Sequence, residues 1–240
     1  MPNTSSARPA PQPAASAGVA QAQAPGPLPA SNVAPLAGLL APCLRGAVFV
    51  LLVTGLAYPL ATTGLARVRF PQQAQGSLLQ VDGALRGSLL IGQSFTEPRY
   101  FHPRPSSTSA PDPQDPSRTV ASPYNAALSA GSNLGPTSQA LAEVVAARVA
   151  DYRRVNGLPP EARVPVDAVT ASASGLDPHI SPANARAQLA RVAAVRGLAP
   201  AAVQALVDAH TEPRVLGLLG EPRVHVLRLN LALDGLVARP

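Results

Sequence analysis

The longest apolar run of the chain is GAVFVLLVTGLAYPLATTGLA, Gly46 to Ala66, which lies between Arg45 and Arg67. It holds about 21 residues without a charge, the length that an α-helix needs to cross the apolar core of a bilayer. A cleaved signal peptide is the competing interpretation, but about 45 residues precede the run, whereas a signal peptide begins with a short basic region. The pattern therefore predicts a single transmembrane helix over residues 43–67 with the lipid bilayer around it, kinked at Pro59.

Small side chains recur along one stripe of this predicted helix, with bulky residues elsewhere. The stripe consists of Ala47, Thr54, Ala57, Ala61 and Gly64. Small residues at such spacing let two helix backbones approach closely, which is how membrane helices associate. We expect the stripe to pack against a helix of a partner protein. Arginines flank the run on both sides, so the positive-inside rule does not choose an orientation.

The segments on either side of the helix differ sharply in composition. Residues 1–42 are Pro, Ala, Ser and Gln with one charge, Arg8, and are expected to form a disordered tail. Residues 72–238 have the pattern of a folded α/β domain. Apolar stretches at Gly76–Val81 and Gly87–Phe95 predict short strands, and alternation from Arg223 to Asp234 predicts a half-buried strand. Residues 102–123, rich in proline, are expected to form a long irregular loop.

Helical spacing alternates with these strands. One helix is expected to begin near Pro136 and to end at Asn156-Gly157. A second begins with Ser181 as its cap and ends at Gly197, and a third runs from about Pro200 to Ala209. The predicted fold class is therefore one N-terminal transmembrane α-helix, then a mixed α/β extracytoplasmic domain, with a disordered N-terminal tail.

Composition narrows the chemistry that the chain can perform. All 19 cationic residues are arginine, so phosphate-binding loops and Schiff-base chemistry, which need lysine, are excluded. The net charge is +6, but there is no Trp and there are only four Phe and four Tyr, so no nucleic acid is expected as a partner. The single cysteine, Cys43, permits no disulfide within the chain.

The stretch TASASGLDPHIS, Thr170 to Ser181, concentrates residues of possible catalytic or metal-binding use. A serine hydrolase would use Ser172 or Ser174 with His179, although the Gly-x-Ser-x-Gly pattern lacks its first glycine. Asp177 and His179 are two potential metal ligands, which do not make a site. The structural interpretation is a tight turn at Gly175 and Asp177-Pro178 that leads into a helix capped by Ser181. No catalytic residue and no metal ligand is predicted.

Short motifs distributed over most of residues 47–236 give the chain a family resemblance. They are Tyr58–Leu60, Gln75–Leu78, Gly92–Phe95, Tyr100–His102, Arg104–Ser106, Tyr124–Ala126, Gly131–Pro136, Val169–Ser172, Ser174–Ser181, Arg191–Ala193, Gly220–Val224 and Leu229–Leu233. In this order, behind one transmembrane helix, they resemble the C subunit of the Kdp-type potassium-transporting ATPase of bacteria. Three positions depart from the family pattern: Pro103 and Ala173 stand in place of Gly, and His225 in place of Asn.

The resemblance implies a subunit that does not itself hydrolyse ATP. Its partners would be a channel-like potassium-translocating subunit and an ATP-hydrolysing P-type subunit. It would lie in the cell inner membrane, with the N-terminus in the cytoplasm and the domain outside. It would support assembly of the complex and raise the affinity of the catalytic subunit for ATP, so that ATP is a cofactor only at the level of the complex. A membrane-anchored serine hydrolase and an anchored binding module are the alternatives.

The resemblance also marks residues that we expect to shape an assembly surface. They are Gln93, Phe95, Arg104, Ser132, Asn133, Ser172, Ser174, Gly175, Asp177, His179, Ser181 and Asn230.

Overall fold

The computed structural model describes residues 36–235, and the chain divides into two compact units, one ending at Ala57 and the other beginning at Tyr58. The disorder expected for residues 1–35 and the last residues of the predicted domain, 236–238, lie outside the described residues. Residues 36–42, which we assigned to the tail, are instead helical. The long apolar helix therefore begins before the predicted boundary at residue 43.

The described part of the first unit is helical throughout. It consists of α1, Leu36–Val50, and a π-helical segment, η1, Leu51–Ala57. A helix from Gly38 to Arg69 is long and apolar enough to cross a membrane, with a mean hydropathy of 2.0, and none of its most apolar stretch is buried among residues 36–235. Together with the mixed α/β region that follows, it confirms the predicted order of one apolar helix that could span a membrane and then a mixed α/β domain.

The π-helical segment has a local cause. A proline lacks the N–H that an α-helix directs to the carbonyl four residues earlier, and its ring collides with that carbonyl. A π-helical turn, with hydrogen bonds spaced five residues apart, widens the helix, and η1 ends two residues before Pro59. Of the predicted small stripe, Ala47 lies in α1 and Thr54 and Ala57 lie in η1, so the stripe runs through the π-helical segment and its packing role stays a prediction. Ala61 and Gly64 lie within α2 and keep helical spacing.

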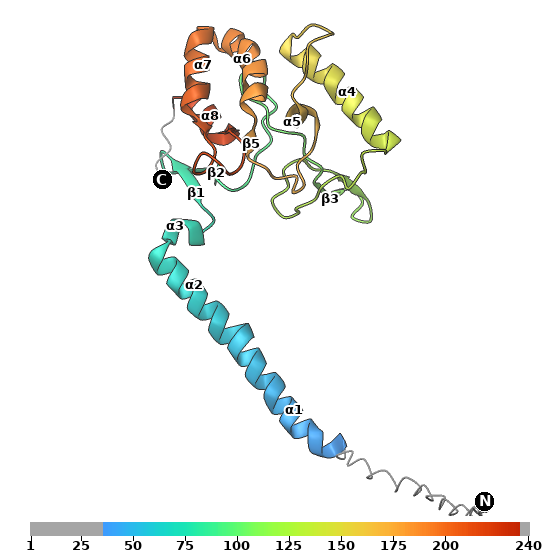
Figure 1. The fold of residues 1–240 in the computed structure, drawn as a ribbon, viewed down its shortest axis with the longest axis vertical. Helices are drawn as coiled ribbons and strands as arrows, with labels where there is room; N and C mark the ends of the chain where they lie inside the picture. The colour runs from blue at the N-terminus through green and yellow to red at the C-terminus, as the bar shows by residue number, and fades with distance from the viewer. Residues whose placement is uncertain (1–35, 236–240) are drawn as a thin grey trace, which may run out of the picture. The chain divides into compact units, whose positions relative to one another are not determined.

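The second unit opens with α2, Tyr58–Arg69, and the short α3, Pro71–Ala74, and then forms three small antiparallel sheets (Figure 1). The strands are β1 (Leu78–Val81), β2 (Ala84–Ser88), β3 (Ser109–Pro111), β4 (Thr119–Ala121), β5 (His179–Ile180), β6 (Thr211–Glu212) and β7 (Arg223–His225). β1 pairs with β2 and β3 with β4, while the third sheet has the order β5-β7-β6. Each sheet is small, so helices and side-chain hydrogen bonds must supply much of the packing.

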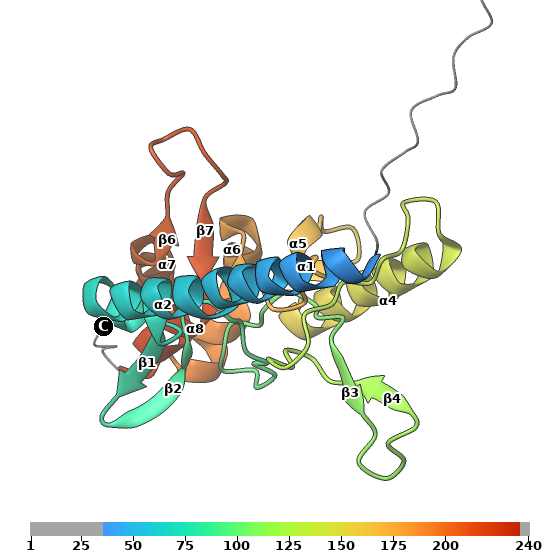
Figure 2. The ribbon, with the colours of Figure 1, turned by 90° about the horizontal axis from the view of Figure 1, so that it is seen from below.

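Five helices complete this unit. They are α4 (Gln139–Asn156), α5 (Val166–Val169), α6 (Pro182–Arg196), α7 (Pro200–Ala209) and α8 (Val226–Leu233) (Figures 1 and 2). The predictions for α6 and α7 are confirmed: Ser181 accepts a hydrogen bond from Asn184 N as the cap of α6, and Gly197 ends it in the left-handed conformation. α4 begins later than predicted, because Ser138 forms its cap and Pro136 lies before the helix instead of in its first turn.

Two further sequence predictions are wrong in detail. The second predicted strand, Gly87–Phe95, shifts to Ala84–Ser88, because the Asp82-Gly83 turn brings the chain back directly after β1. The segment 102–123 is not irregular throughout, since β3 and β4 form a hairpin within it.

The predicted strand from Arg223 to Asp234 ends at His225, and the leucines beyond it belong to α8. Val226, Leu229 and Leu233 face one apolar cluster of the core, whereas Leu227 and Leu231 face a second. Because α8 is buried on both of these sides and exposes only Arg228 among Val226–Leu231, its leucines at every second position imitate the alternation of a strand.

Two side-chain amides hold an extended segment of backbone against α6 and α8. Asn230 Oδ1 accepts from Phe101 N at 2.9 Å, and its Nδ2 donates to Phe101 O at 3.0 Å. Gln188 does the same for the next residue: Oε1 accepts from His102 N at 2.7 Å and Nε2 donates to His102 O at 3.0 Å. We call these four bonds the amide clamp. Asn230 and Gln188 are about 1% exposed and so replace a neighbouring strand inside the core.

Arginines extend this clamp toward the preceding residues. Arg191 donates to the carbonyls of Tyr100, at 3.0 Å, and Pro98. Arg196 donates to Arg99 O at 2.7 Å, and its Nη2 pairs with Asp234 at 2.8 Å. The clamped segment therefore has its polar backbone satisfied by side chains, which fixes the start of the path that leads to Arg104.

His225 joins the third sheet to α8 and to the segment after β2. Its Nε2 lies 2.9 Å from Leu89 O, and its Nδ1 accepts from Arg228 N at 3.5 Å as the cap of α8. A ring that donates from Nε2 and accepts at Nδ1 is the neutral form. Burial lowers the pKa of His225; the hydrogen bond to Leu89 opposes this, and the charges of His179 and Arg228 add to it.

We predict that Asn230→Leu destabilises the fold by about 2–4 kcal/mol, because it leaves the N–H and C=O of Phe101 buried without partners. Urea unfolding of the purified full-length chain in mild detergent, followed by circular dichroism, measures the change. Gln204→Leu is the control, since this amide on α7 bonds only the side chain of Asp208 at the surface, and it should cost no more than about 0.5 kcal/mol. Equal effects of the two substitutions would contradict the clamp.

We predict that His225 makes the fold sensitive to mild acid. The pKa of His225 is depressed in the folded state, so the unfolded chain binds the proton at a higher pH than the folded chain does. The free energy of unfolding therefore falls as the pH drops through about 6.5, the ordinary pKa of histidine. His179 of β5, Glu212 of β6 and Arg228 of α8 are the charged or titratable groups that act on the ring. Asn keeps a capping oxygen without titrating. His225→Asn should therefore lose less stability than the wild type between pH 8 and pH 5, and parallel losses would contradict the prediction.

Candidate functional site

Several of the sequence motifs meet at the stretch from Thr170 to Ser181. Ser174 O accepts from Ala130 N at 2.9 Å, and Leu176 O accepts from Gly92 N at 2.8 Å. Gly175 O accepts from Ser106 Oγ at 2.7 Å. We call the residues that meet here, Gly92, Arg104–Ser106, Tyr124, Ala130–Gly131 and Ser172–His179, the motif junction. Segments up to about 85 positions apart in the chain are thus joined by backbone contacts.

Two glycines of the motif junction are required by close approach. A Cβ on Gly92 would lie 2.5 Å from the Tyr124 ring and 2.7 Å from Asp177 O. A Cβ on Gly175 would lie 2.6 Å from Ala130 O, and its φ of +68° is in the left-handed region that favours glycine. The tight turn expected at Gly175 is therefore present, and it serves to bring two backbones together.

Hydroxyl groups that the sequence analysis did not single out hold this packing. Ser106 Oγ accepts from Tyr124 N at 3.0 Å, and Tyr124 OH donates to Arg104 O at 2.8 Å. Burial raises the pKa of Tyr124 well above its usual value, and the charge of Asp177 adds to this, so the phenol stays protonated as a donor. Thr108, only 2% exposed, donates to Ser122 O at 2.6 Å. Ser106 and Tyr124 belong to the family motifs Arg104–Ser106 and Tyr124–Ala126, so the sequence marked both residues, but it assigned no role to their hydroxyl groups.

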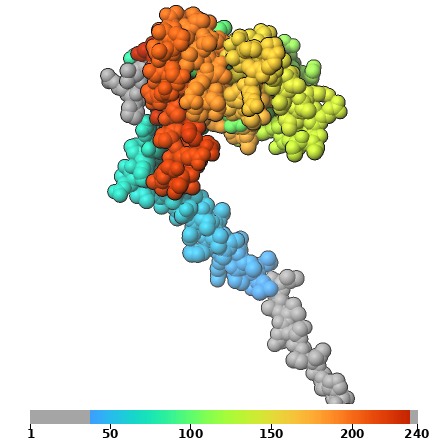
Figure 3. Space-filling view, turned by 45° about the horizontal axis from the view of Figure 1, so that its top comes forward, coloured from blue at the N-terminus to red at the C-terminus, as the bar shows by residue number. Residues whose placement is uncertain are grey.

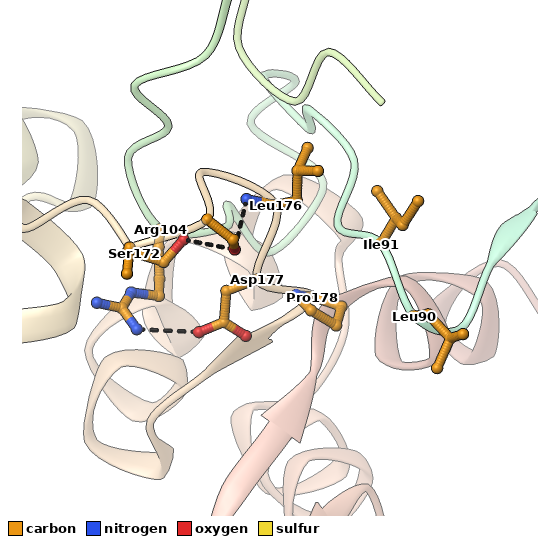
Figure 4. A pocket seen from close by; sticks show the side chains of 9 residues that line it. Leu90, Ile91, Arg104, Ser172, Leu176, Asp177 and Pro178 are labelled. Atoms are coloured by element: carbon orange, nitrogen blue, oxygen red, sulfur yellow. Dashed lines mark hydrogen bonds and ion pairs between the residues drawn. The ribbon is translucent and has the colours of Figure 1, made fainter. Parts of the chain in front are cut away.

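Asp177 is the electrostatic centre of the motif junction. Its Oδ2 accepts from Arg104 Nη1 at 2.9 Å (Figure 4). Its Oδ1 accepts from His179 N at 3.0 Å and lies 3.2 Å from His179 Nδ1. Burial disfavours the ionised carboxylate, but the hydrogen bonds of His179 and the Arg104 guanidinium outweigh it and lower the pKa of Asp177. Asp177 is thus ionised and fully engaged, linking the Pro178 turn to the clamped segment.

The groups that suggested catalysis do not form a nucleophile–base pair. Ser174 Oγ accepts from Leu176 N at 3.1 Å and lies 3.4 Å from Ser172 Oγ. The His179 ring faces Asp177 and packs edge-on against His225, with ring centroids 5.2 Å apart. Within residues 36–235, no group of three His, Cys, Asp or Glu side chains could hold a metal ion.

An open hollow marks the outer side of the motif junction. It is lined by Leu90, Ile91, Arg104, Ser172, Ala173, Ser174, Leu176, Asp177 and Pro178 (Figure 4). One wall is polar, with Arg104 and Asp177, and the other is apolar. Arg104 Nε is buried and has no hydrogen-bond partner among the described residues. Such a hollow can receive a side chain of a partner protein.

The remaining predicted site residues lie outside the motif junction, in different parts of the fold. Ser181 caps α6 as expected, and Asp167 accepts from both its N and its Oγ, at 2.7 and 2.8 Å. Gln93 donates to Arg86 O at 2.7 Å, and Phe95 packs against both apolar clusters. Ser132 and Asn133 are exposed on the loop before α4. Asn230 was expected at an assembly surface, but it lies in the core as part of the amide clamp. No sequence signal identified Asp167.

Comparison with known proteins shows that the chain is similar to one protein family over most of its length. Residues 40–235 match the family model described as KdpC, the c chain of K⁺-transporting ATPase. The potassium-transporting ATPase KdpC subunit of Rhodopseudomonas palustris strain BisB18 is 61% identical over 183 residues, which cover 76% of this chain and 90% of the relative. The subunit of the same name from Bradyrhizobium diazoefficiens is 56% identical over 200 residues, 82% of this chain and 98% of the relative. The subunit of the same name from Methylobacterium nodulans is 57% identical over 200 residues, which cover 83% of this chain and 98% of the relative.

The family match covers well over half of the chain, and these relatives are matched over nearly their whole length. The order of motifs, the apolar helix before them and their convergence at one junction agree with it. The chain belongs to the KdpC family, the c chains of K⁺-transporting ATPases.

Proposed function

We propose that the chain is a non-catalytic, single-pass subunit that stabilises a K⁺-transporting ATPase. Its partners are a channel-like potassium-translocating subunit and an ATP-hydrolysing P-type subunit. Family membership supports the complex, and one observation supports the role within it. Among the described residues, an apolar helix that the others leave exposed is joined to a domain whose polar groups are engaged with one another. A lone helix of this kind gains stability by packing against other membrane helices.

The non-catalytic part of the proposal rests on the motif junction. Asp177 is occupied by Arg104 and His179, and Ser174 by the backbone of Leu176. Lysine, which the common ATP-hydrolysing motifs require, is absent from the chain. These observations weigh against the serine hydrolase alternative. They leave the hollow and the exposed loop Ser132–Asn133 as surfaces for contact with the other subunits.

We further propose the inner membrane as the location, with the N-terminus in the cytoplasm and the domain outside. On that side of the membrane the domain cannot touch ATP. Any increase in the ATP affinity of the catalytic subunit would therefore have to act through the membrane helices, as a coupling free energy between distant sites.

Deleting the gene should abolish growth at limiting potassium in cells that retain the other subunits, because the complex fails to assemble or dissociates. Purified complex with and without the chain should differ in subunit recovery and, for the coupling role, in the KM for ATP at unchanged kcat. Unchanged growth would overturn the subunit role. An intact complex whose KM for ATP does not depend on the chain would overturn the coupling role alone.

Ala57→Leu combined with Ala61→Leu should weaken co-purification with the other subunits, because bulk at a close helix contact costs about 1–3 kcal/mol, or roughly five- to over one-hundredfold in affinity. Leu60→Phe adds bulk where the helix is already bulky and serves as the control. The fraction of chain recovered on a tagged partner subunit measures the effect. Equal recovery of the double variant and the control would refute the role of the small residues.

A further inference from the structure

The connection between β6 and β7 ends in an apolar tip. Its four apolar side chains are Val215, Leu216, Leu218 and Leu219, exposed by 52%, 86%, 80% and 64%. We call them the leucine knob. The connection stands out from the domain in Figure 2, beyond the arrows of β6 and β7, and forms a lobe in Figure 3. Exposed apolar side chains gathered in this way typically mark an interaction site.

Backbone hydrogen bonds hold the leucine knob in one conformation. Val215 and Leu219 exchange both backbone hydrogen bonds at 2.9 Å, and Leu218 N donates to Val215 O at 3.1 Å across the turn. These bonds close a tight hairpin whose two central residues, Leu216 and Gly217, have φ of 54° and 73°. The side chains therefore project from a fixed backbone, which lowers the entropy lost on binding.

Leucine is an unusual choice at the first of these central positions. Such turns favour Asn, Asp or Gly there, because a residue with a bulky side chain is strained at positive φ. The chain itself shows the ordinary solution: the β1–β2 hairpin has Asp82 and Gly83 with φ of 52° and 75°. The tip of β3–β4 is likewise polar, with Asp112 and Asp115 accepting from backbone N–H groups. A strained, exposed leucine at the third tip points to a use for its side chain.

The surroundings of the leucine knob indicate what it contacts. Residues 215–220 carry no charge, and the arginines at the base are neutralised: Arg214 pairs with Glu221 at 2.7 Å and Arg223 with Glu212 at 3.0 Å. Segments that enter a lipid surface typically carry unpaired Lys or Arg and Trp or Tyr anchors. The leucine knob has neither, so its chemistry fits an uncharged apolar groove in a protein.

We propose that the leucine knob docks into an uncharged apolar groove on another subunit of the transport complex. The inference rests on the proposed function and adds to it a second contact, outside the membrane helix. Binding at two points on one chain strengthens association beyond either contact alone.

The affinity test combines Leu216→Asn with Leu218→Ser. Asn suits the turn, so the chain should unfold at the same or a higher temperature than the wild type, while its dissociation constant for the complex of the other subunits rises at least about tenfold. Val195→Ser, which removes a side chain 55% exposed on α6, is the control and should leave the dissociation constant unchanged. A normal dissociation constant for the double variant would overturn the proposal, and so would an equal loss for the control.

The occupant test uses an environment-sensitive fluorophore on Leu219→Cys in a Cys43→Ser background, with the full-length chain in nanodiscs. The emission should match that in water for the chain alone, in zwitterionic or anionic lipid, and should shift to the blue when the other subunits are added. A blue shift without them would assign the leucine knob to lipid, and one that grows with the concentration of the chain would assign it to a second copy; either overturns the proposal.

The two tests also distinguish a failure of the docking proposal from a failure of the proposed function. A complex that forms without a blue shift would refute the docking while leaving the proposed function intact. If the wild-type chain fails to bind the other subunits at all, both fall together.

Discussion

The fold of the domain depends on side-chain amides that replace a missing strand. Asn230 and Gln188 each bind both backbone groups of one residue, Phe101 and His102. Sheets of two or three short strands cannot satisfy the polar backbone of an extended segment that crosses the core. Because an unpaired buried N–H or C=O costs about 1–3 kcal/mol, this segment can lie between α6 and α8 only if those helices supply the partners.

The same constraint positions the motif junction. The clamped backbone leads directly to Arg104, whose guanidinium reaches Asp177 73 residues further on. Asp177 in turn orders His179, and His225 opposite it caps α8, the helix that carries Asn230. The apolar core and the motif junction are therefore two ends of one hydrogen-bonded arrangement. Residues that look catalytic in the sequence are accounted for by their places in it.

The sequence predicted those features that depend on nearby residues. The cap at Ser181, the end of α6 at Gly197 and the limits of α7 follow from local backbone chemistry, and all three are present. α8 was mistaken for a strand because its burial between two clusters hides the helical period. Phe101, the partner of Asn230, and Arg104, the cationic partner of Asp177, lie far away in the chain, and the segment that holds them has no regular pattern. Asp167 beneath Ser181 was missed for the same reason.

We propose a protein that works by holding others in place, and family membership, the apolar helix and the engaged polar groups support this proposal. For that role the domain should be ordered before its partners bind. Amide hydrogen exchange at Phe101 and His102 in the purified, unassembled chain tests this most directly, because both N–H groups lie outside any sheet or helix. We expect exchange as slow as that of the buried turns of α6. Exchange as fast as in the exposed turn 112–118, or protection only after the other subunits are added, would contradict it.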